Sequence, residues 1–375
     1  MYGRPFVSLA FATVAAALTS WDDWSHGRVA LQDVSIHFRY AGSGPPLLLV
    51  HGNPQFSLTW REVGPLLAEN FTVIAPDNRG AGDSSIPPDG NYSSSVSADD
   101  LKGVLDSLNI TSAYVFSHDK GVGAATALAI KYPSLVKRLG VGEYAYPGFG
   151  YETAANPAPY WDLYGNSQLA FFQVPDLAEF LISGKEKLFL EWYFYHGSYS
   201  GASSIPEDIV NQYTSSIAKP GFLRAMLGPF SSQTVAADNA FFKSSFGKKK
   251  LSMPLLALGG EASFGIPSLL KQIFGPASDN LQVDVVPKAG HWIGAYCMGP
   301  NPFPLNPPRA PICIPETNRN VADENPKWLA TRINKFFSEG SKSLPAIDLS
   351  WFENKVTLSV GYFGTYHNLA LGSTQ

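Results

Sequence analysis

The chain has 375 residues, of which 45% are hydrophobic and 15% are charged, and its formal net charge is −4. This composition predicts a globular protein with a large core, and the negative charge argues against a nucleic-acid partner. No stretch after the N-terminus is long and apolar enough to span a membrane, so we expect no stable membrane association once a leader is removed.

The first 20 residues have the pattern of a secretory signal peptide. A basic n-region is followed by an apolar run from Phe6 to Leu18 and then by small residues. Three N-glycosylation sequons lie further along the chain and agree with a secretory route. Their asparagines are Asn70, Asn91 and Asn109. We therefore expect a secreted, extracellular glycoprotein.

Apolar, β-prone segments alternate with helical segments through the mature chain. Ser35–Tyr40 alternates as a half-buried strand does, whereas Pro46–Val50 is a continuous apolar run typical of a strand buried on both faces. A helix over Ala98–Leu108 places three leucines on one face. Further strands are predicted at Phe71–Ala75, Tyr114–Phe116, Leu139–Gly142, Pro254–Leu258 and Leu281–Val286. This rhythm predicts an α/β fold with a mostly parallel, doubly wound sheet.

Between residues 147 and 250 the pattern changes to helices that are rich in aromatic side chains. We interpret this segment as a helical cap inserted between two strands of the core. The core would then comprise residues 21–146 and 251–340. Residues 341–375 would form a C-terminal extension, to which the sequence assigns no role.

A proline-rich loop, residues 294–320, interrupts the second part of the core and contains both cysteines of the chain. A secreted context favours a disulfide bond between Cys297 and Cys313, and two cysteines offer too few ligands for a metal site. Because prolines and a disulfide would stiffen the loop, we expect a rigid wall beside the histidine that precedes it.

The segment Ser117–Gly121 is the most informative in the chain. A β-prone strand precedes it and a helix that opens with small residues follows, as in a nucleophile elbow, where the central side chain stands exposed at a strained corner. The central residue is Asp119. A carboxylate at this corner can attack a saturated carbon and form an alkyl ester, which water must then hydrolyse with a base and an oxyanion hole. Alternatively, an aspartate in an ordinary turn of this kind caps the following helix.

Four motifs occur in order along the chain. They are HGNP at 51–54, DNRGAGDS at 77–84, SHDKG at 117–121 and AGHW at 289–292. With these motifs the chain resembles the α/β-hydrolase superfamily, and more closely its epoxide hydrolase and haloalkane or haloacetate dehalogenase branch, which uses an aspartate nucleophile. The resemblance covers roughly residues 30–295 and the helix near 327–337. It implies an α/β-hydrolase fold with an inserted helical cap.

The resemblance implies that Asp119 is the nucleophile and His291 the base. Two glutamates compete for the acid that orients His291. Glu143 ends the strand after the elbow helix, where several members carry their acid, and Glu261 follows a later strand, where others carry it. In those others the acid usually comes slightly later, at the position held here by Ser263. We favour Glu143 and keep Glu261 as the alternative.

The oxyanion of the second step is expected to be held by the backbone N–H groups of Asn53 and Lys120. The resemblance also implies that the peptide bond before Pro54 is cis. Nearby charged residues that we expect to brace loops are Asp77, Arg79 and Asp83.

An epoxide also needs a hydrogen-bond donor for the oxygen that is released as the ring opens. Relatives supply two tyrosines, or a tyrosine and a histidine, from the cap. Gln168 stands where the histidine is often found, and Leu227–Phe230 lacks the second tyrosine. We therefore name Gln168 and Tyr195 as possible cap donors. Other tyrosines that could reach the site are Tyr160, Tyr164, Tyr199 and Tyr213.

The features of the dehalogenases are incomplete. Asn53 fits the haloalkane pattern, but the tryptophan usual after the nucleophile is replaced by Lys120. Haloacetate enzymes carry arginines at the positions held here by Lys120 and Gly123, so their carboxylate clamp is missing.

The sequence thus predicts a secreted, epoxide hydrolase-like enzyme that opens a small apolar epoxide to a diol through an ester on Asp119, without a metal or organic cofactor. Alternatives are a dehalogenase with the same mechanism, a ring-opening or cyclising enzyme of specialised metabolism, and a non-catalytic ligand-binding homologue. The presence of Asp119, His291 and Glu143 together favours an enzyme.

Overall fold

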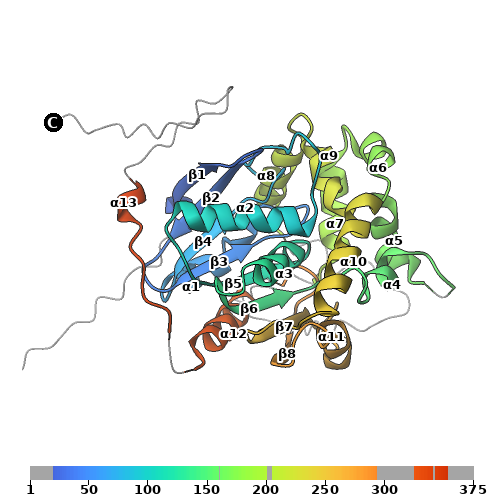
Figure 1. The fold of residues 1–375 in the computed structure, drawn as a ribbon. Coiled ribbons are helices and arrows are strands. Elements are labelled where there is room, and N and C mark those ends of the chain that lie inside the picture. Colours follow the sequence, from blue (N-terminus) through green and yellow to red (C-terminus); the bar gives the residue numbers. More distant parts are fainter. Residues whose placement is uncertain (1–19, 160, 201–204, 294–324, 341–342, 354–375) are drawn as a thin grey trace, which may run out of the picture.

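A computed structural model describes residues 20–159, 161–200, 205–293, 325–340 and 343–353, and Figure 1 shows their fold. Residues 1–19 of the predicted signal peptide, Tyr160, the whole proline-rich loop with both cysteines, and most of the C-terminal extension lie outside the described residues. The signal peptide, the disulfide and the rigid loop wall therefore stay predictions.

Eight strands form one sheet in the order β1-β2-β4-β3-β5-β6-β7-β8. β1 pairs antiparallel with β2, and β2 with β4, whereas all other neighbours are parallel. The strands are β1 (Ser25–Ala30), β2 (Ser35–Ala41), β3 (Pro46–Val50), β4 (Thr72–Pro76), β5 (Ala113–His118), β6 (Val136–Gly142), β7 (Leu255–Gly260) and β8 (Leu281–Val286). The predicted α/β fold with a mostly parallel sheet is confirmed. β1 was not predicted, because this edge strand is only partly buried and half of its residues are polar.

The helices of the core flank this sheet on both faces. They are α1 (Val63–Ala68), α2 (Ser94–Ser107), α3 (Gly121–Lys131), α11 (Pro267–Phe274), α12 (Pro326–Ser338) and α13 (Ser350–Glu353), with short 3-10 helices η1 (Trp21–Asp23) and η2 (Ser57–Trp60). Within the part of the chain that the structure describes, no helix combines the length and the hydropathy needed to cross a membrane.

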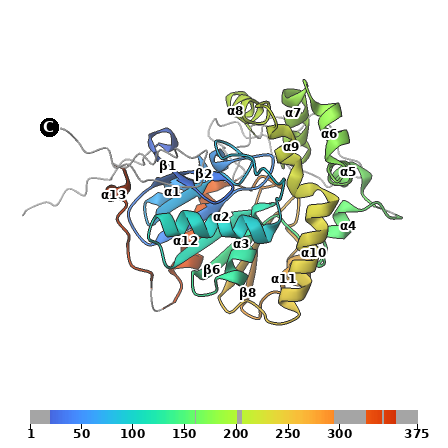
Figure 2. The ribbon, with the colours of Figure 1, turned by 45° about the horizontal axis from the view of Figure 1, so that its top comes forward.

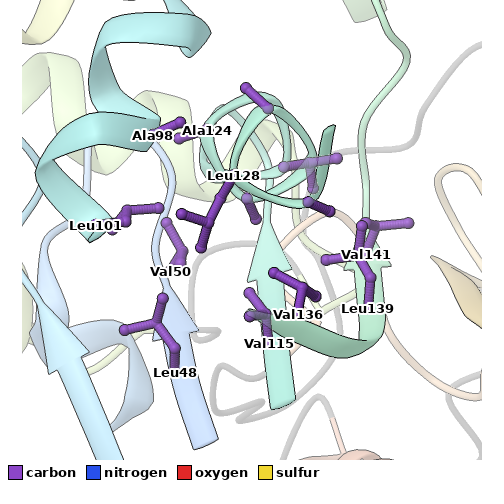
Figure 3. Close-up of a cluster of buried hydrophobic side chains, with 14 of the residues drawn as sticks. Leu48, Val50, Ala98, Leu101, Val115, Ala124, Leu128, Val136, Leu139 and Val141 are labelled. Atoms are coloured by element: carbon purple, nitrogen blue, oxygen red, sulfur yellow. The ribbon is translucent and has the colours of Figure 1, made fainter. Parts of the chain in front are cut away.

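The middle of the sheet is buried on both faces. Along β3, Leu48 and Val50 belong to the cluster under α2 and α3, which Figure 3 shows in close-up. Leu47 and Leu49 belong instead to the cluster that contains side chains of α1 and α12. Burying one such leucine stabilises the fold by about 1.5–3 kcal/mol. The two-sided burial explains why this strand is apolar at every position.

Helices α4 to α10 lie between β6 and β7 in the chain and form a cap, which Figures 1 and 2 show gathered on one side of the core. They are α4 (Tyr151–Ala155), α5 (Leu163–Phe172), α6 (Pro175–Ile182), α7 (Glu186–His196), α8 (Glu207–Ile217), α9 (Phe222–Leu227) and α10 (Ser232–Phe246), with η4 (Gly228–Phe230). The Trp292 indole N–H donates to Phe194 O at 2.9 Å, and the Asn53 side-chain amide donates to Met226 O at 2.8 Å. The cap is thus held against the two motif loops that begin at residues 51 and 289.

The described part of the C-terminal extension packs on the core. Ile347 forms a bridge with Gly44, and the Phe352 ring lies 5.7 Å from that of Phe38 and 5.8 Å from that of Tyr40. This segment therefore covers apolar side chains of β2.

Candidate active site

The elbow has the strained geometry that its sequence predicts. Asp119 lies between β5 and α3 with φ of 49°, in the left-handed region that side-chain-bearing residues rarely adopt. The turn requires a glycine two residues later, because a Cβ on Gly121 would overlap the backbone of His51. The corner therefore points the Asp119 side chain away from the helix and toward the HGNP loop.

The Asp119 carboxylate lies where the oxyanion hole was predicted. The backbone N–H of Asn53 donates to Oδ1 at 2.8 Å, and the backbone N–H of Lys120 also bonds the carboxylate. The Asn53–Pro54 peptide bond is cis, as the resemblance implies. Burial opposes the charge, but the hydrogen bond and positive charge of His291 lower the pKa of Asp119 to about 2. The carboxylate is therefore ionised at neutral pH and able to act as a nucleophile.

His291 lies between two carboxylates. Its Nε2 is 3.5 Å from Asp119 Oδ2, and its Nδ1 is 3.0 Å from Glu143 Oε2. Burial would lower the pKa of His291, but hydrogen bonds and charge interactions with Asp119 and Glu143 raise it to about 10. The neighbouring His118 stays neutral, because burial and the charge of His291 lower its pKa to about 4. Of His291 and His118, only His291 is therefore protonated at neutral pH.

Glu143, and not Glu261, contacts His291 in the structure. Glu143 is 1% exposed and has φ of 58°, and its Oε1 accepts the backbone N–H of Gly260 at 2.6 Å. Its Oε2 accepts the hydroxyl of Ser263 at 2.6 Å as well as facing His291. The exposed Glu261 instead accepts the backbone N–H of Lys288 at 2.8 Å.

The two predicted cap donors have their described interactions within the cap. The Gln168 amide donates to the carbonyl of Gly165 within its own helix, at 2.9 Å. Tyr195 is half-buried, and burial raises its pKa first, with Glu191 and Glu207 adding to the shift. The charges that act on it thus belong to the cap.

Three other tyrosines lie within electrostatic range of Asp119. For Tyr144, Tyr151 and Tyr193, burial raises the pKa first and the negative charge of Asp119 adds to it. Sequence reasoning did not select these tyrosines from the aromatic residues of the chain. Tyr144 directly follows Glu143 and Tyr151 begins the first cap helix, which are the signals that could have found them.

The Lys120 side chain also enters the site. Its Nζ donates to Tyr151 Oη at 2.9 Å and lies 4.5 Å from the centroid of the Phe230 ring. Burial lowers the pKa of Lys120 to about 8, although the charges of Asp119 and Asp238 oppose that shift. Lys120 thus contributes a cation beside the nucleophile.

A cluster of His37, Asp77 and Asp83 has the spacing of metal ligands among the described residues. Hydrogen bonds already occupy Asp77, whose Oδ2 lies 2.7 Å from His37 Nδ1 and accepts the N–H of Asp83 at 2.9 Å. Its Oδ1 accepts the N–H of Ser57 at 2.8 Å. The arrangement therefore braces the loops beside the elbow, and it does not face Asp119.

The predicted glycosylation sites lie at the surface to different degrees. Asn70 and Asn109 are exposed, whereas Asn91 is half-buried and its side-chain oxygen accepts the N–H of Ser93 at 3.0 Å. Asn70 and Asn109 are thus the more accessible candidates.

Comparisons with known proteins agree with this geometry. The family model described as alpha/beta hydrolase fold matches residues 45–294. The soluble epoxide hydrolase of Corynebacterium sp. strain C12 is 29% identical over 272 residues, covering 72% of this chain and 91% of that protein. A fluoroacetate dehalogenase of Burkholderia sp. is 39% identical over 117 residues, covering 30% of this chain and 38% of that protein.

The fold is also shared with solved structures. Wild-type Cfl2 from Burkholderia cenocepacia superposes with a TM-score of 0.71 at 28% identity, covering 86% of this chain and 97% of that one. The chain therefore belongs to the α/β-hydrolase family, as a hydrolase of the branch that contains epoxide hydrolases and a haloacetate dehalogenase.

Proposed function

We propose that this protein opens an apolar epoxide to a diol through a covalent ester on Asp119. The observation that carries the proposal is an ionised carboxylate at a strained elbow, bonded through Oδ1 to the Asn53 amide and facing His291 through Oδ2. Serine chemistry is excluded at this position because the residue at the corner, Asp119, carries no hydroxyl. A carboxylate instead suits attack on a saturated carbon.

In the first step, Asp119 Oδ2 attacks an epoxide carbon, the ring C–O bond breaks, and the released oxygen takes a proton. Oδ1 becomes the carbonyl oxygen of the ester and keeps its hydrogen bond from Asn53. In the second step, water attacks the ester carbonyl carbon while His291 takes its proton. The amides of Asn53 and Lys120 hold the oxyanion that forms there. When this intermediate collapses, the bond between the carbonyl carbon and Oδ2 breaks. Oδ2 then leaves in the diol with the second proton of the water, and the water oxygen remains in the Asp119 carboxylate.

The electrostatics of His291 suit this order of events. While Asp119 is an anion, His291 is charged and cannot act as a base, because its pKa is raised to about 10. Ester formation removes the negative charge of Asp119 and the hydrogen bond that it accepts. The pKa of His291 must then fall, so that the imidazole becomes a base only after the ester has formed.

Aromatic packing on the cap side of His291 supports an apolar substrate. Tyr193 and Phe172 in the cap have ring centroids 5.7 Å apart, and the Trp292 ring lies 5.5 Å from Tyr193 and 4.6 Å from His291. These buried rings give the surroundings of His291 an apolar character.

The test is the intact mass of a His291→Gln variant after exposure to panels of epoxides, alkyl halides and haloacetates. Without the base, the ester should form and persist. An epoxide adds its whole mass to the protein, whereas an alkyl halide adds its mass less hydrogen halide. An adduct from a halide would indicate dehalogenation. This is the alternative function, because one relative is named fluoroacetate dehalogenase.

Two further variants make this test specific. Adding Asp119→Asn to the His291→Gln protein should abolish the adduct, and His26→Gln, on the edge strand β1, should give turnover without an adduct. If the His291→Gln protein gains no mass from any panel, the covalent mechanism is wrong.

We also propose that the protein is a secreted glycoprotein with a Cys297–Cys313 disulfide. The exposure of Asn70 and Asn109 supports glycan attachment there. Expression in a eukaryotic host should yield protein in the medium that starts near residue 21 and loses mass on glycosidase treatment. Non-reducing peptide mapping should join the two cysteine peptides. An intracellular product that retains Met1 would contradict this proposal.

A further inference from the structure

The ammonium group of Lys120 lies at the boundary between the core and the cap, among aromatic rings. Its Nζ is 4.1 Å from the centroid of Tyr151, 4.5 Å from that of Phe230 and 5.6 Å from that of Tyr144. Tyr151 and Phe230 belong to the cap and Tyr144 follows β6 in the core. The half-buried Lys120 thus places a cation against these rings, beside the nucleophile that precedes it in the chain.

This ammonium has no carboxylate within 4.0 Å among the described residues. The Asp238 carboxylate accepts the N–H and the hydroxyl of Ser94, at 2.8 Å and 2.7 Å. The Asn53 amide donates to Oδ1 of Asp119, and Oδ2 of the same carboxylate faces His291. Placing a cation among apolar rings without a direct ion pair is unfavourable. Such a cation can stabilise negative charge that develops during a reaction.

Tyr151 receives the hydrogen bond from this ammonium. Because an ammonium has only donors, Tyr151 Oη must be the acceptor in the 2.9 Å bond with Lys120 Nζ. The hydroxyl hydrogen of Tyr151 is then left for another acceptor, and the described residues provide none. This bond holds the hydroxyl of Tyr151, which is 5% exposed, against the residue that directly follows Asp119 in the chain.

We propose that Tyr151 and Lys120 together protonate the oxygen that is released when Asp119 opens the epoxide. This inference rests on the proposed function. It assigns the proton donation expected of cap residues to Lys120, which follows the nucleophile, and to Tyr151, which begins the cap. It assigns no part in proton donation to Gln168 or Tyr195.

The protons balance over the cycle. As the bond from Asp119 to carbon forms and the ring C–O bond breaks, Tyr151 gives its proton to the oxygen and Lys120 gives one to the phenolate. His291 releases a proton to solvent when the ester forms, and Lys120 recovers one from solvent. His291 then takes the proton of the attacking water, which restores the resting state and leaves a diol.

The charge state of Lys120 agrees with this role. Its pKa of about 8 makes the ammonium a stronger acid than an exposed lysine, and yet it remains mostly charged at neutral pH. The titratable groups that face it are Asp119, Asp238, Tyr144 and Tyr151.

The experiment measures the rate of adduct formation by intact mass in the His291→Gln background, where the first step is isolated. Lys120→Met and Tyr151→Phe should each slow alkylation by an epoxide by about a hundredfold or more, the usual range for a lost general acid. The double variant should be no slower than the worse single variant, because the two groups act as a unit. Lys120→Arg, which keeps a donor and a charge, should retain more activity than Lys120→Met.

A pH profile separates proton donation from a structural role. The epoxide alkylation rate of the His291→Gln parent should fall above about pH 8, and in Lys120→Met this fall should disappear. Alkylation by an alkyl bromide, whose leaving group needs no proton, should change by less than about tenfold in the same variants. Surface controls are Lys131→Met and Tyr132→Phe, a lysine and a tyrosine that both bond Asp99 outside the site.

Two results would overturn the inference. The first is a rate of epoxide alkylation in Lys120→Met or Tyr151→Phe that stays within about threefold of the parent rate. The second is a pH profile that does not change in Lys120→Met. Failure of the parent itself to form an adduct would refute the proposed function instead, so the two failures are distinguishable.

Discussion

Replacing Glu143 by glutamine tests how the site times its two steps. Glu143 contacts His291 Nδ1 through Oε2 at 3.0 Å and is anchored through Oε1 by the Gly260 N–H. Glutamine keeps that anchor and the size of the side chain, but it removes the negative charge and turns an N–H₂ group toward His291. The imidazole then loses the partner that stabilises its charged form, which arises when it takes a proton from water.

The size of the effect follows from the geometry. Two unit charges about 4 Å apart at an effective dielectric constant of about 20 interact by about 4 kcal/mol. A loss of that size in the transition state slows ester hydrolysis by roughly a thousandfold. Alkylation should slow by less than about tenfold, because His291 takes no proton in that step.

The assay is rapid quenching followed by intact mass, with an epoxide that the wild-type protein turns over. In Glu143→Gln the adduct on Asp119 should form and accumulate, as in a protein without its base. The matched control is Glu261→Gln, because this exposed carboxylate bonds only the Lys288 amide in the described structure. Accumulation of the adduct in Glu261→Gln, or its absence in Glu143→Gln, would refute the assignment of Glu143.

Three further outcomes are expected. A Cβ on Gly52 would overlap the Asp119 carboxylate, so Gly52→Ala should lower alkylation by at least about a hundredfold with little change in melting temperature, and wild-type rates would contradict this. Arg79 donates two hydrogen bonds of 2.6 Å and 2.7 Å to Asp100. Asp100→Asn should therefore lower the free energy of unfolding in urea by about 3–5 kcal/mol. A loss below about 1 kcal/mol would show that the buried arginine is solvated. The pKa of His291 is raised to about 10 from its usual value of 6.5. Its contribution to stability is therefore complete below pH 6.5 and is lost as pH rises through 10. Urea unfolding across this window should show a smaller decline in His291→Gln than in the wild type, and equal declines would argue against the charged resting state.

The local patterns of the chain determined the class of fold and the nature of its most distinctive side chain. Continuous apolar runs such as Pro46–Val50 predicted buried parallel strands, because only burial on both faces favours an apolar residue at every position. The small residues around Asp119 predicted the elbow, because only a tight strand-to-helix corner needs them. The edge strand β1 was missed, since a partly buried strand in which half of the residues are polar carries no such pattern.

The choice of acid was decided by tertiary structure. Glu143 and Glu261 follow neighbouring parallel strands, β6 and β7, so both arrive at the same edge of the sheet and the sequence left both open. The left-handed backbone at Glu143 and the hydrogen bond from Ser263 direct its carboxylate to His291. The turn after β7 sends Glu261 to Lys288 instead.

The tyrosines near the nucleophile were likewise decided by packing. Along α7, Tyr193 and Tyr195 are two residues apart and therefore lie on different faces of the helix. Tyr193 is 6% exposed and packs on Trp292, whereas Tyr195 is half-buried. The charged residues of this helix mark one face, where Lys187 pairs with Glu191, but its aromatic residues are spread over the rest of the helix. The sequence therefore does not single out one tyrosine, and the packing of the cap against Trp292 decides that Tyr193 is the buried one.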